Sequence, residues 1–420
     1  MPIKPAALLP MNPGTAMDIC LVSRVSCRAN GGTSAYIGGL GAALRRRGHT
    51  VQGLSVFNIA APVVTDYGAF DRDSPRLLES EGGEIETRLV SPTGMASKLL
   101  PRMATLLTRG VTRRLGIDLY ISALRESVAQ AIPASVNVVH YTGNGFEMIG
   151  FAALAEARRR GIPFTVMPFV HPNAWGDSDL DVELYNRADA IFICSEYEGK
   201  HLESRGVRPQ KLRRTGLAPA TSKVGDPVGF RRKHNLGERP LVLFVGRKER
   251  YKGYHALRQA MTDVVKAVPD ACLIAVGADV EPPFPLVPDG ALLDLGQLPQ
   301  NLTGEQEKSD AFDACDIFCM PSNAEAFGIV YAEAWSYGKP VVGGPAPAVR
   351  ELIEAGVTGY CVSQEPREIA DVLIRMLKDR EGSRRMGANG LALQSARFTW
   401  DTVSENHERV FMQLRSASIG

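Results

Sequence analysis

Short apolar runs alternate with amphipathic segments along most of the chain. The run at 18–23 predicts a strand, and the helical periodicity at 33–47 ends at Gly48, a typical helix stop. Further apolar runs predict strands at 50–57, 137–141, 163–170 and 189–194. Strands that alternate with helices in this way predict a doubly wound parallel sheet with helices on both faces.

A second alternation of the same kind fills the other half of the chain. It follows residues 217–239, where Pro, Gly, Lys and Asp interrupt the periodicity and predict a linker. Six apolar runs then predict strands at 241–245, 272–276, 292–295, 316–320, 340–343 and 360–362. Helical patterns lie between these runs, and 400–412 predicts one more helix with no strand after it. The expected fold class is therefore α/β, with two Rossmann-like sheets.

The length of 420 residues also favours two domains, because single hydrophobic cores rarely grow to that size. We expect an N-terminal domain over 17–216, the linker over 217–239 and a C-terminal domain over 240–399. The final segment, 400–420, is expected to cross back onto the first domain. Residues 1–16 contain only a brief apolar patch and are expected to be a disordered extension rather than a signal peptide.

Composition narrows the class of protein. The 48 basic and 46 acidic residues nearly cancel, which gives no general argument for a nucleic-acid partner. The seven cysteines are scattered, mostly in apolar runs, and predict buried thiols in a reducing cytoplasm rather than a disulfide framework. No apolar run approaches the 18 or so residues of a membrane span.

Two glutamates eight positions apart, Glu325 and Glu333, follow the predicted strand at 316–320. If the next helix begins near Phe327, Glu333 lies about two turns inside it, and eight positions at about 1.5 Å each span roughly 12 Å. That length suits a sugar, a diphosphate and a ribose, with the helix N-terminus facing the phosphates. Arg247 and Lys252, after another predicted strand, would supply positive charge to the diphosphate. The pattern predicts a sugar-nucleotide site.

Several short motifs occur in a fixed order along the chain. They are Gly31-Gly-Thr33, Phe169-Val-His171, Ala188 to Ser195, Val245-Gly-Arg247 with Lys252-Gly253, Glu325-Ala-Phe-Gly328 with Glu333 to Gly338, and Thr358-Gly359. In this order they resemble the retaining GT-B glycosyltransferases, particularly glycosyltransferase family four, over nearly the whole chain. The resemblance implies two Rossmann-like domains that face each other across a cleft, with the acceptor on the first and the donor on the second.

The resemblance also implies roles for matching positions. Glu325 would contact hydroxyls of the donor sugar, Glu333 the ribose, and His171 the sugar near its reacting face. The implied donor-binding set is Gly31, Gly32, Arg247, Lys252, Glu325, Ala326, Phe327, Gly328, Ile329 and Glu333. The implied catalytic set is His171, Arg247, Lys252 and Glu325.

The expected activity is transfer of a hexose-type unit from a nucleoside diphosphate sugar to an acceptor hydroxyl, with retention at the anomeric carbon. The acceptor would be a small molecule, a glycan or a lipid-linked molecule. Because Arg247 and Lys252 would already neutralise the diphosphate, we expect no metal or other cofactor. The acidic stretch Asp177-Ser-Asp179 is then interpreted as a polar loop or helix cap.

Other readings stay open at the level of sequence. The chain could be a non-catalytic relative that binds a sugar nucleotide, or a phosphorylase or epimerase on the same fold. Gly31 and Gly32 fit either a phosphate loop or tight helix packing, and His171 and His140 fit either a site or a core. The basic segment 95–115 fits either a peripheral contact on the inner membrane face or an ordinary surface helix.

Overall fold

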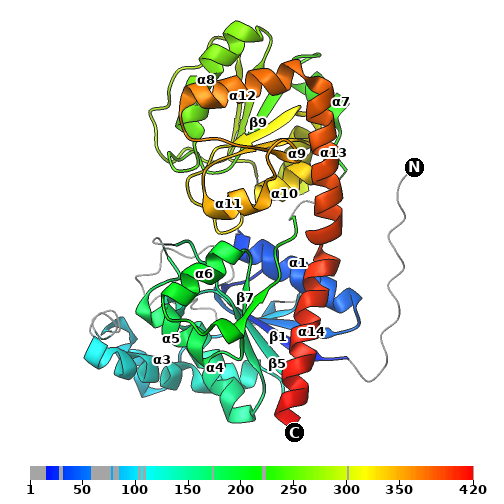
Figure 1. Cartoon of the computed structure of the whole chain (residues 1–420). Coiled ribbons are helices and arrows are strands. Elements are labelled where there is room, and N and C mark those ends of the chain that lie inside the picture. The colour runs from blue at the N-terminus through cyan, green and yellow to red at the C-terminus, as the bar shows by residue number, and fades with distance from the viewer. Residues whose placement is uncertain are drawn as a thin grey trace. The chain divides into compact units, whose positions relative to one another are not determined.

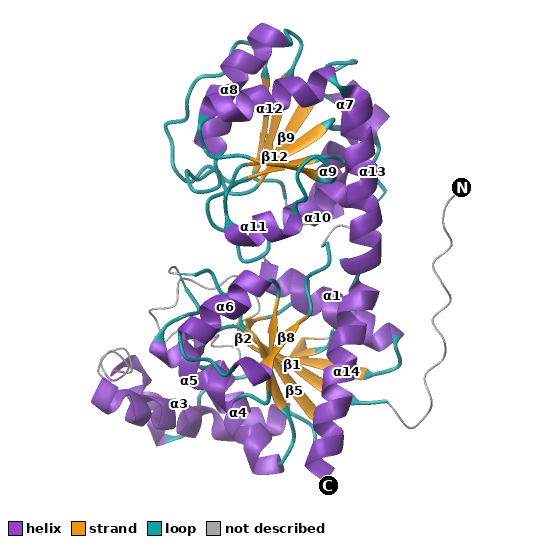
Figure 2. Ribbon diagram, viewed as in Figure 1, coloured by secondary structure: helices purple, strands orange, loops and turns teal. Residues whose placement is uncertain are grey.

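Two compact units make up the chain. The computed structural model describes residues 16–27, 32–57, 77–78, 85–102, 106, 110–172, 175–219, 224–299 and 302–419. Contacts between residues group Met1–Cys194, Glu198–Thr215 and Trp400–Gly420 into a first unit. The second unit contains Ser195–Tyr197 and Gly216–Thr399. Each unit contains one twisted sheet with helices on both faces (Figure 1 and Figure 2).

The first unit has an eight-stranded sheet in the order β3-β4-β2-β1-β5-β6-β7-β8, parallel except for the β3 and β4 pair at its edge. Its strands are β1 (Asp18–Val25), β2 (Thr50–Phe57), β3 (Leu77–Leu78), β4 (Thr87–Leu89), β5 (Val138–Thr142), β6 (Phe164–Met167), β7 (Ala190–Ile193) and β8 (Leu212–Arg214). Its helical segments are α1 (Gly32–Arg46), η1 (Met95–Arg102), α3 (Gly110–Ala131), η2 (Gly145–Glu147), α4 (Ile149–Arg160), α5 (Asp179–Arg187), α6 (Glu196–Ser204), η3 (Pro209–Lys211) and α14 (Trp400–Ile419). Strands β5, β6 and β7 are buried along their whole length, because helices cover both faces of a parallel sheet.

The last helix, α14, packs on α1 within the first unit (Figure 1). The Tyr36 hydroxyl lies 2.7 Å from Nε2 of His407 on α14, in a fully buried contact. Gly39 permits the close approach, because a Cβ there would lie 2.2 Å from the Trp400 ring. At the rim, Nε of Arg47 donates to Oε2 of Glu408 at 2.6 Å. A core of aromatic and imidazole rings therefore fixes the end of the chain to this unit.

The second unit has a six-stranded parallel sheet in the order β11-β10-β9-β12-β13-β14. Its strands are β9 (Leu241–Val245), β10 (Cys272–Val276), β11 (Leu292–Gly296), β12 (Ile317–Met320), β13 (Val341–Gly343) and β14 (Gly359–Cys361). Its helices are α7 (Pro227–Lys233), α8 (Tyr254–Ala267), α9 (Leu302–Ala314), α10 (Ile329–Ser336), α11 (Pro347–Leu352), α12 (Pro366–Lys378) and α13 (Arg380–Arg397). Helices α8 and α12 cover one face, whereas α9, α10 and α13 lie on the other (Figure 1).

The expected α/β class with two Rossmann-like sheets is confirmed, and several details differ from the sequence prediction. The range 217–239, interpreted as a linker, contains α7 and groups with the second unit. Helix α10 begins at Ile329 rather than near Phe327. Glu333 therefore lies about one turn inside the helix, and only five of the eight positions after Glu325 are helical. The roughly 12 Å helical span was wrong for this reason.

Three other expectations concern the ends and surface of the chain. Residues 1–15 of the predicted extension lie outside the described residues. So do 103–105 and 107–109 of the basic segment 95–115, where the described side chains of Met95 and Leu99 are exposed. Membrane contact through this segment stays a prediction. Among the described helices, none is both long and apolar enough to cross a bilayer.

Candidate functional site

The loops that follow β9 and β12 meet at the carboxyl edge of the second sheet. These strands are neighbours, so their carboxyl ends open onto the same edge, where α/β folds bind ligands. Nζ of Lys252, after β9, lies 2.5 Å from Oε1 of Glu325, after β12. Both side chains are largely buried, with 14% and 8% exposed. The two motifs that carried the sequence argument therefore form one ion pair.

The backbone around this ion pair is held by close contacts. Gly253 has φ +79°, and a Cβ there would lie 2.5 Å from the Pro321 carbonyl oxygen, so a side chain does not fit. Nε2 of Gln364 donates to the carbonyl of Tyr251 at 2.9 Å and to that of Pro321 at 2.7 Å. The amide of Asn323 also donates to the Tyr251 carbonyl, at 2.8 Å. These bonds tie the two loops together.

Arg247 is an exposed cation at this edge. Its side chain is 56% exposed and lies 3.1 Å from the carboxylate of Glu249. It also donates to the Tyr251 hydroxyl at 3.2 Å. Nζ of Lys252 lies 5.1 Å from the centre of the Tyr251 ring, within cation–π range. Tyr251 therefore contacts both cations, a role that the sequence prediction missed.

Helix α10 begins beside Glu325 with its N-terminus uncapped by any side chain that the structure describes. Its N-cap is Gly328, at φ +83°. The Tyr331 hydroxyl donates to the Met320 carbonyl at 2.6 Å and fixes the first turn to β12. Unpaired N–H groups and the positive end of the helix dipole favour an anion at such a terminus. Ala326 and Phe327 are buried just before it.

Glu333 is buried on α10 and has a basic partner. Nζ of Lys308, on α9, lies 3.1 Å from its Oε1, and the Glu333 side chain is 3% exposed. Lys308 was not among the predicted site residues. Its sequence neighbourhood gives no signal, because only the packing of α9 against the sheet brings it to Glu333.

A second buried lysine lies on the β10 and β11 side of this edge. Nζ of Lys248 donates to Oδ1 of Asp279 at 2.7 Å and to Oδ1 of Asp294 at 2.5 Å. Burial disfavours the charged amine, yet these hydrogen bonds outweigh it and raise the pKa of Lys248 above its usual value. Lys248 therefore stays a cation and joins the loops after β9 and β10 to strand β11. The sequence prediction missed this contact as well.

The predicted residues of the first unit lie at the carboxyl edge of its own sheet. His171 follows β6, exchanges two 3.0 Å backbone hydrogen bonds with Trp175, and lies with its ring centroid 3.8 Å from the indole. Gly32 begins α1 and is exposed, with open space where a Cβ would stand. Gly31 lies outside the described residues. No observation in the first unit tests a donor role for these positions.

Two other sequence candidates are structural. Ser178 caps α5, with Asp181 completing a capping box, and Asp177 lies 2.8 Å from Nε2 of His201. His140 is buried between Tyr36 and Thr165. Among the described residues, no group of three His, Cys, Asp or Glu side chains is placed to hold a metal.

An unpredicted polar group lies at the carboxyl end of β5. The Tyr141 hydroxyl donates to Oε2 of Glu147 at 2.9 Å. Burial raises the pKa of Glu147 to about 7, although Tyr141 and the nearby Arg24 charge oppose the shift. Oγ1 of Thr142 is buried and finds no hydrogen-bond partner within the described structure. Such an unpaired group is costly unless a ligand or water completes it.

Comparisons with known proteins agree on the class of protein. Residues 31–218 match the family model of the glycosyl transferase 4-like domain, and residues 229–392 match that of glycosyl transferases group 1. A D-inositol 3-phosphate glycosyltransferase of Xylanimonas cellulosilytica is 30% identical over 412 residues, which cover 91% of this chain and 92% of that protein. A GDP-mannose-dependent alpha-(1-6)-phosphatidylinositol monomannoside mannosyltransferase of Mycobacterium tuberculosis is 29% identical over 185 residues, 42% of this chain and 48% of that protein.

Solved structures show the same fold. Sucrose-phosphate synthase from Thermosynechococcus elongatus superposes with a TM-score of 0.69 at 19% identity, covering 95% of this chain and 100% of that one. HepE from Anabaena, solved in complex with UDP and glucose, gives a TM-score of 0.69 at 17% identity with the same coverage.

Proposed function

This chain belongs to the GT-B glycosyltransferases of the group 1, family-four type, and we propose that it moves a hexose from a nucleoside diphosphate sugar to an acceptor hydroxyl with retention and without a metal. The observation that carries the proposal is the Lys252 and Glu325 pair, which lies beside the uncapped N-terminus of α10. This arrangement brings together a carboxylate for the sugar hydroxyls, an ammonium group for the diphosphate, and amide donors for the phosphate oxygens.

The diphosphate would lie against the start of α10. The amides of Gly328 and Ile329 would donate to its oxygens, and the helix dipole would add to the attraction. Lys252 and the exposed Arg247 would supply the two side-chain cations. Because these charges are fixed in place, they would stabilise the negative charge that grows on the leaving diphosphate.

Glu325 and Glu333 would hold the two ends of the donor. Glu325 would accept hydrogen bonds from sugar hydroxyls, and Glu333 would accept from the ribose. The 3.1 Å contact with Lys308 supports this, because it holds the Glu333 carboxylate in one orientation. His171 is proposed to contact the sugar near its reacting carbon. The acceptor would attack from the face that the diphosphate leaves, and the leaving oxygen would take its proton.

The acceptor is proposed to be a phosphorylated polyol. The support comes from relatives that carry the name D-inositol 3-phosphate glycosyltransferase, including one that aligns with most of this chain. Within the first unit, Arg24 lies near Glu147, and Thr142 has an unpaired hydroxyl at the same edge. Arg24 would take the phosphate, while Glu147 and Thr142 would bind polyol hydroxyls.

A panel of UDP-, GDP- and ADP-sugars tests the donor assignment. At least one should raise the Tm of the protein and release its nucleoside diphosphate when inositol 3-phosphate is added. Glu325→Gln should lower turnover at least a hundredfold when assayed well below its Tm, which should itself fall because Lys252 loses its partner. Asp263→Asn, an exposed site in the same unit, serves as the matched control. Full turnover by Glu325→Gln would refute the site.

Two further measurements address the chemistry. NMR of the product should show the anomeric configuration of the donor sugar, and an inverted product would refute retention. Turnover should persist in excess EDTA, and its loss, restored by a divalent cation, would refute the metal-independent proposal.

A further inference from the structure

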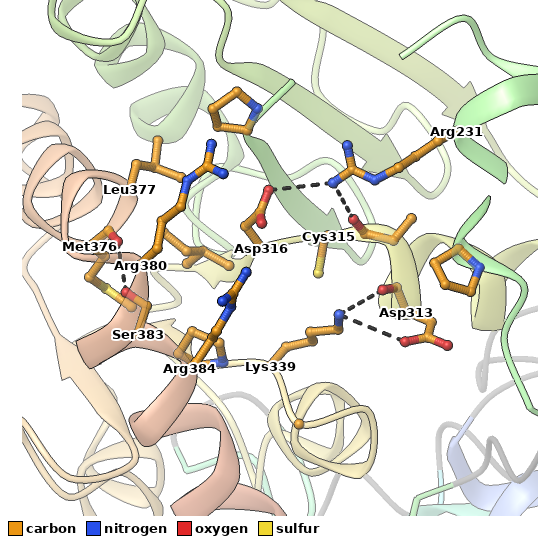
Figure 3. A pocket seen from close by; sticks show the side chains of 16 residues that line it. Arg231, Asp313, Cys315, Asp316, Lys339, Met376, Leu377, Arg380, Ser383 and Arg384 are labelled. Carbon is orange, nitrogen blue, oxygen red and sulfur yellow. Dashed lines mark hydrogen bonds and ion pairs between the residues drawn. The ribbon is translucent and has the colours of Figure 1, made fainter. Parts of the chain in front are cut away.

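A separate pocket lies at the opposite edge of the second sheet, where β9, β12 and β13 begin (Figure 3). Pro240, Asp316 and Pro340 immediately precede these strands and line it. The donor residues follow β9 and β12 at the other end, so the five residues of β9, at roughly 3.3 Å each, separate the two places by about 16 Å. The pocket has a volume of about 260 Å³. It is therefore distinct from the proposed donor site.

Both carboxylates of this pocket already have basic partners. Asp316 lies 3.5 Å from the guanidinium of Arg231, which also donates to the Ala314 carbonyl at 2.8 Å. Asp313 lies 3.7 Å from Nζ of Lys339. Figure 3 shows these contacts along one side of the pocket. The charges of Asp313 and Asp316 are thus already balanced by Lys339 and Arg231.

Two further arginines of the pocket have no acidic partner among the described residues. Arg380 and Arg384 lie one turn apart on α13 and both line the pocket (Figure 3). Within the part of the chain that the structure describes, neither guanidinium group has a hydrogen bond or an ion pair. Like charges at this spacing, with Cβ atoms about 6 Å apart, repel each other. Their neighbour Arg385 differs, because it pairs with Glu381 at 2.7 Å.

The N-terminus of α13 does not account for the attraction for an anion, because it already has a side-chain cap. Asp379 caps the helix, and its Oδ1 accepts from the Gly382 amide at 2.9 Å. Ser383 is also satisfied, since its hydroxyl donates to the Met376 carbonyl at 2.7 Å. The attraction for an anion therefore resides in the two guanidinium groups.

The size and lining of the pocket narrow the class of ligand. A volume of about 260 Å³ leaves room for a small phosphorylated ligand such as a sugar phosphate. Met376 and Leu377 give it an apolar wall. Burial raises the pKa of the Cys315 thiol to about 12, so this lining cysteine is no nucleophile at neutral pH. The pocket is suited to binding rather than to chemistry.

We propose that this pocket binds a phosphomonoester of a sugar or small polyol, with the phosphate between Arg380 and Arg384. A phosphomonoester carries close to two negative charges at neutral pH, which matches the two unpaired guanidinium groups. Planar guanidinium groups bind phosphate oxygens through paired N–H donors. The sugar hydroxyls would donate to the carboxylates of Asp313 and Asp316, and the carbon skeleton would lie against Met376.

Isothermal titration with glucose 6-phosphate tests the proposal, with saturating UDP present to occupy the donor edge and glucose as the uncharged probe. Wild-type protein should bind glucose 6-phosphate and not glucose. The double variant Arg380→Ala with Arg384→Ala should weaken binding at least tenfold. The matched control is Arg385→Ala, which removes the same charge from the next position and should change Kd by less than twofold.

Three results would overturn the proposal. Wild-type protein that binds neither glucose 6-phosphate nor glycerol 3-phosphate at millimolar concentration would exclude the ligand class. Unchanged binding by the double variant would place the ligand elsewhere. An equal loss in Arg385→Ala would show general charge attraction rather than a site. Unfolding curves of the variants should match the wild type, since none of the three arginines is buried.

Discussion

Replacing Lys252 with methionine should both destabilise the second unit and abolish sugar transfer. Both effects are expected because the ion pair between Lys252 and Glu325 is lost. The change removes the basic partner of Glu325 and leaves a carboxylate that is only 8% exposed. Stranding one member of a buried pair costs about 3–5 kcal/mol. The nearby α10 N-terminus offsets up to about 1 kcal/mol of this. We therefore expect a loss of about 3 kcal/mol in the free energy of unfolding.

Calorimetry of the purified variants measures this loss. For a unit the size of Gly216–Thr399, 1 kcal/mol corresponds to roughly 2–4 °C, so the Tm should fall by about 6–12 °C. Adding Glu325→Gln removes the stranded charge and should recover about half of the loss, while transfer stays abolished. The exposed pair of Lys266 and Asp263 provides the control, where Lys266→Met should cost less than about 1 kcal/mol.

The refuting result is specific. If Lys252→Met changes the free energy of unfolding by less than about 1 kcal/mol, or if the double variant is less stable than the single one, the pair does not act as a buried charge pair. The donor-site proposal would then lose the contact on which it depends.

Three further predictions concern other parts of the molecule. Gly253→Ala should cost about 1–3 kcal/mol and reduce donor affinity, because φ is +79° and the new methyl meets the Pro321 carbonyl; an unchanged Tm would contradict this. Lys248→Met should destabilise by about 1–2 kcal/mol, because the hydrogen bonds to Asp279 and Asp294 are lost while these partly exposed carboxylates stay hydrated, as urea unfolding would show. Burial lowers the pKa of His140 and of His407, the latter from 6.5 to about 4. Each of these histidines then binds more protons in the unfolded chain below pH 6.5, so their contribution to the free energy of unfolding should fall from pH 6.5 to 4, against an opposing contribution from Glu147 with its raised pKa. His407→Gln should flatten that slope, and an unchanged slope would contradict the assignment.

The central strands could be predicted from the sequence because burial on both faces requires apolar residues. Strands buried on both faces are continuous apolar runs, and 241–245 and 272–276 match β9 and β10 residue for residue. The range 50–57 also matches β2, although Gln52, Gly53 and Ser55 interrupt its apolar residues. The edge strand β8 was missed, because its sequence Leu-Arg-Arg is short and partly exposed.

Helix α13 was missed because its own sequence does not favour a helix. It contains Gly382, Gly387 and Gly390, which lower helix propensity. Tertiary packing requires the last two, since a Cβ at Gly390 would lie 2.0 Å from the Trp335 ring and one at Gly387 1.9 Å from the Gly338 carbonyl oxygen. Only the folded unit shows why these positions are glycine.

Some residues of the candidate site could be predicted from the sequence, and others could not. Lys252 and Glu325 could be found because each lies in a short motif after a predicted strand, and parallel strands open onto one edge. Tyr251, Lys308 and Gln364 could not, because their contacts depend on loops and helices from elsewhere in the unit. Motifs identify the groups proposed to touch the ligand, whereas the residues that orient them become visible only in three dimensions.

The placement of α14 makes the second unit an insertion within the first, because Gly216–Thr399 lies between two segments of the first unit. During synthesis the second unit is complete well before the first, whose α1 surface lacks its cover until residues 400–420 leave the ribosome. A chain stopped at 399 should keep a folded second unit and expose the apolar surface around Tyr36, which would recruit chaperones or aggregate.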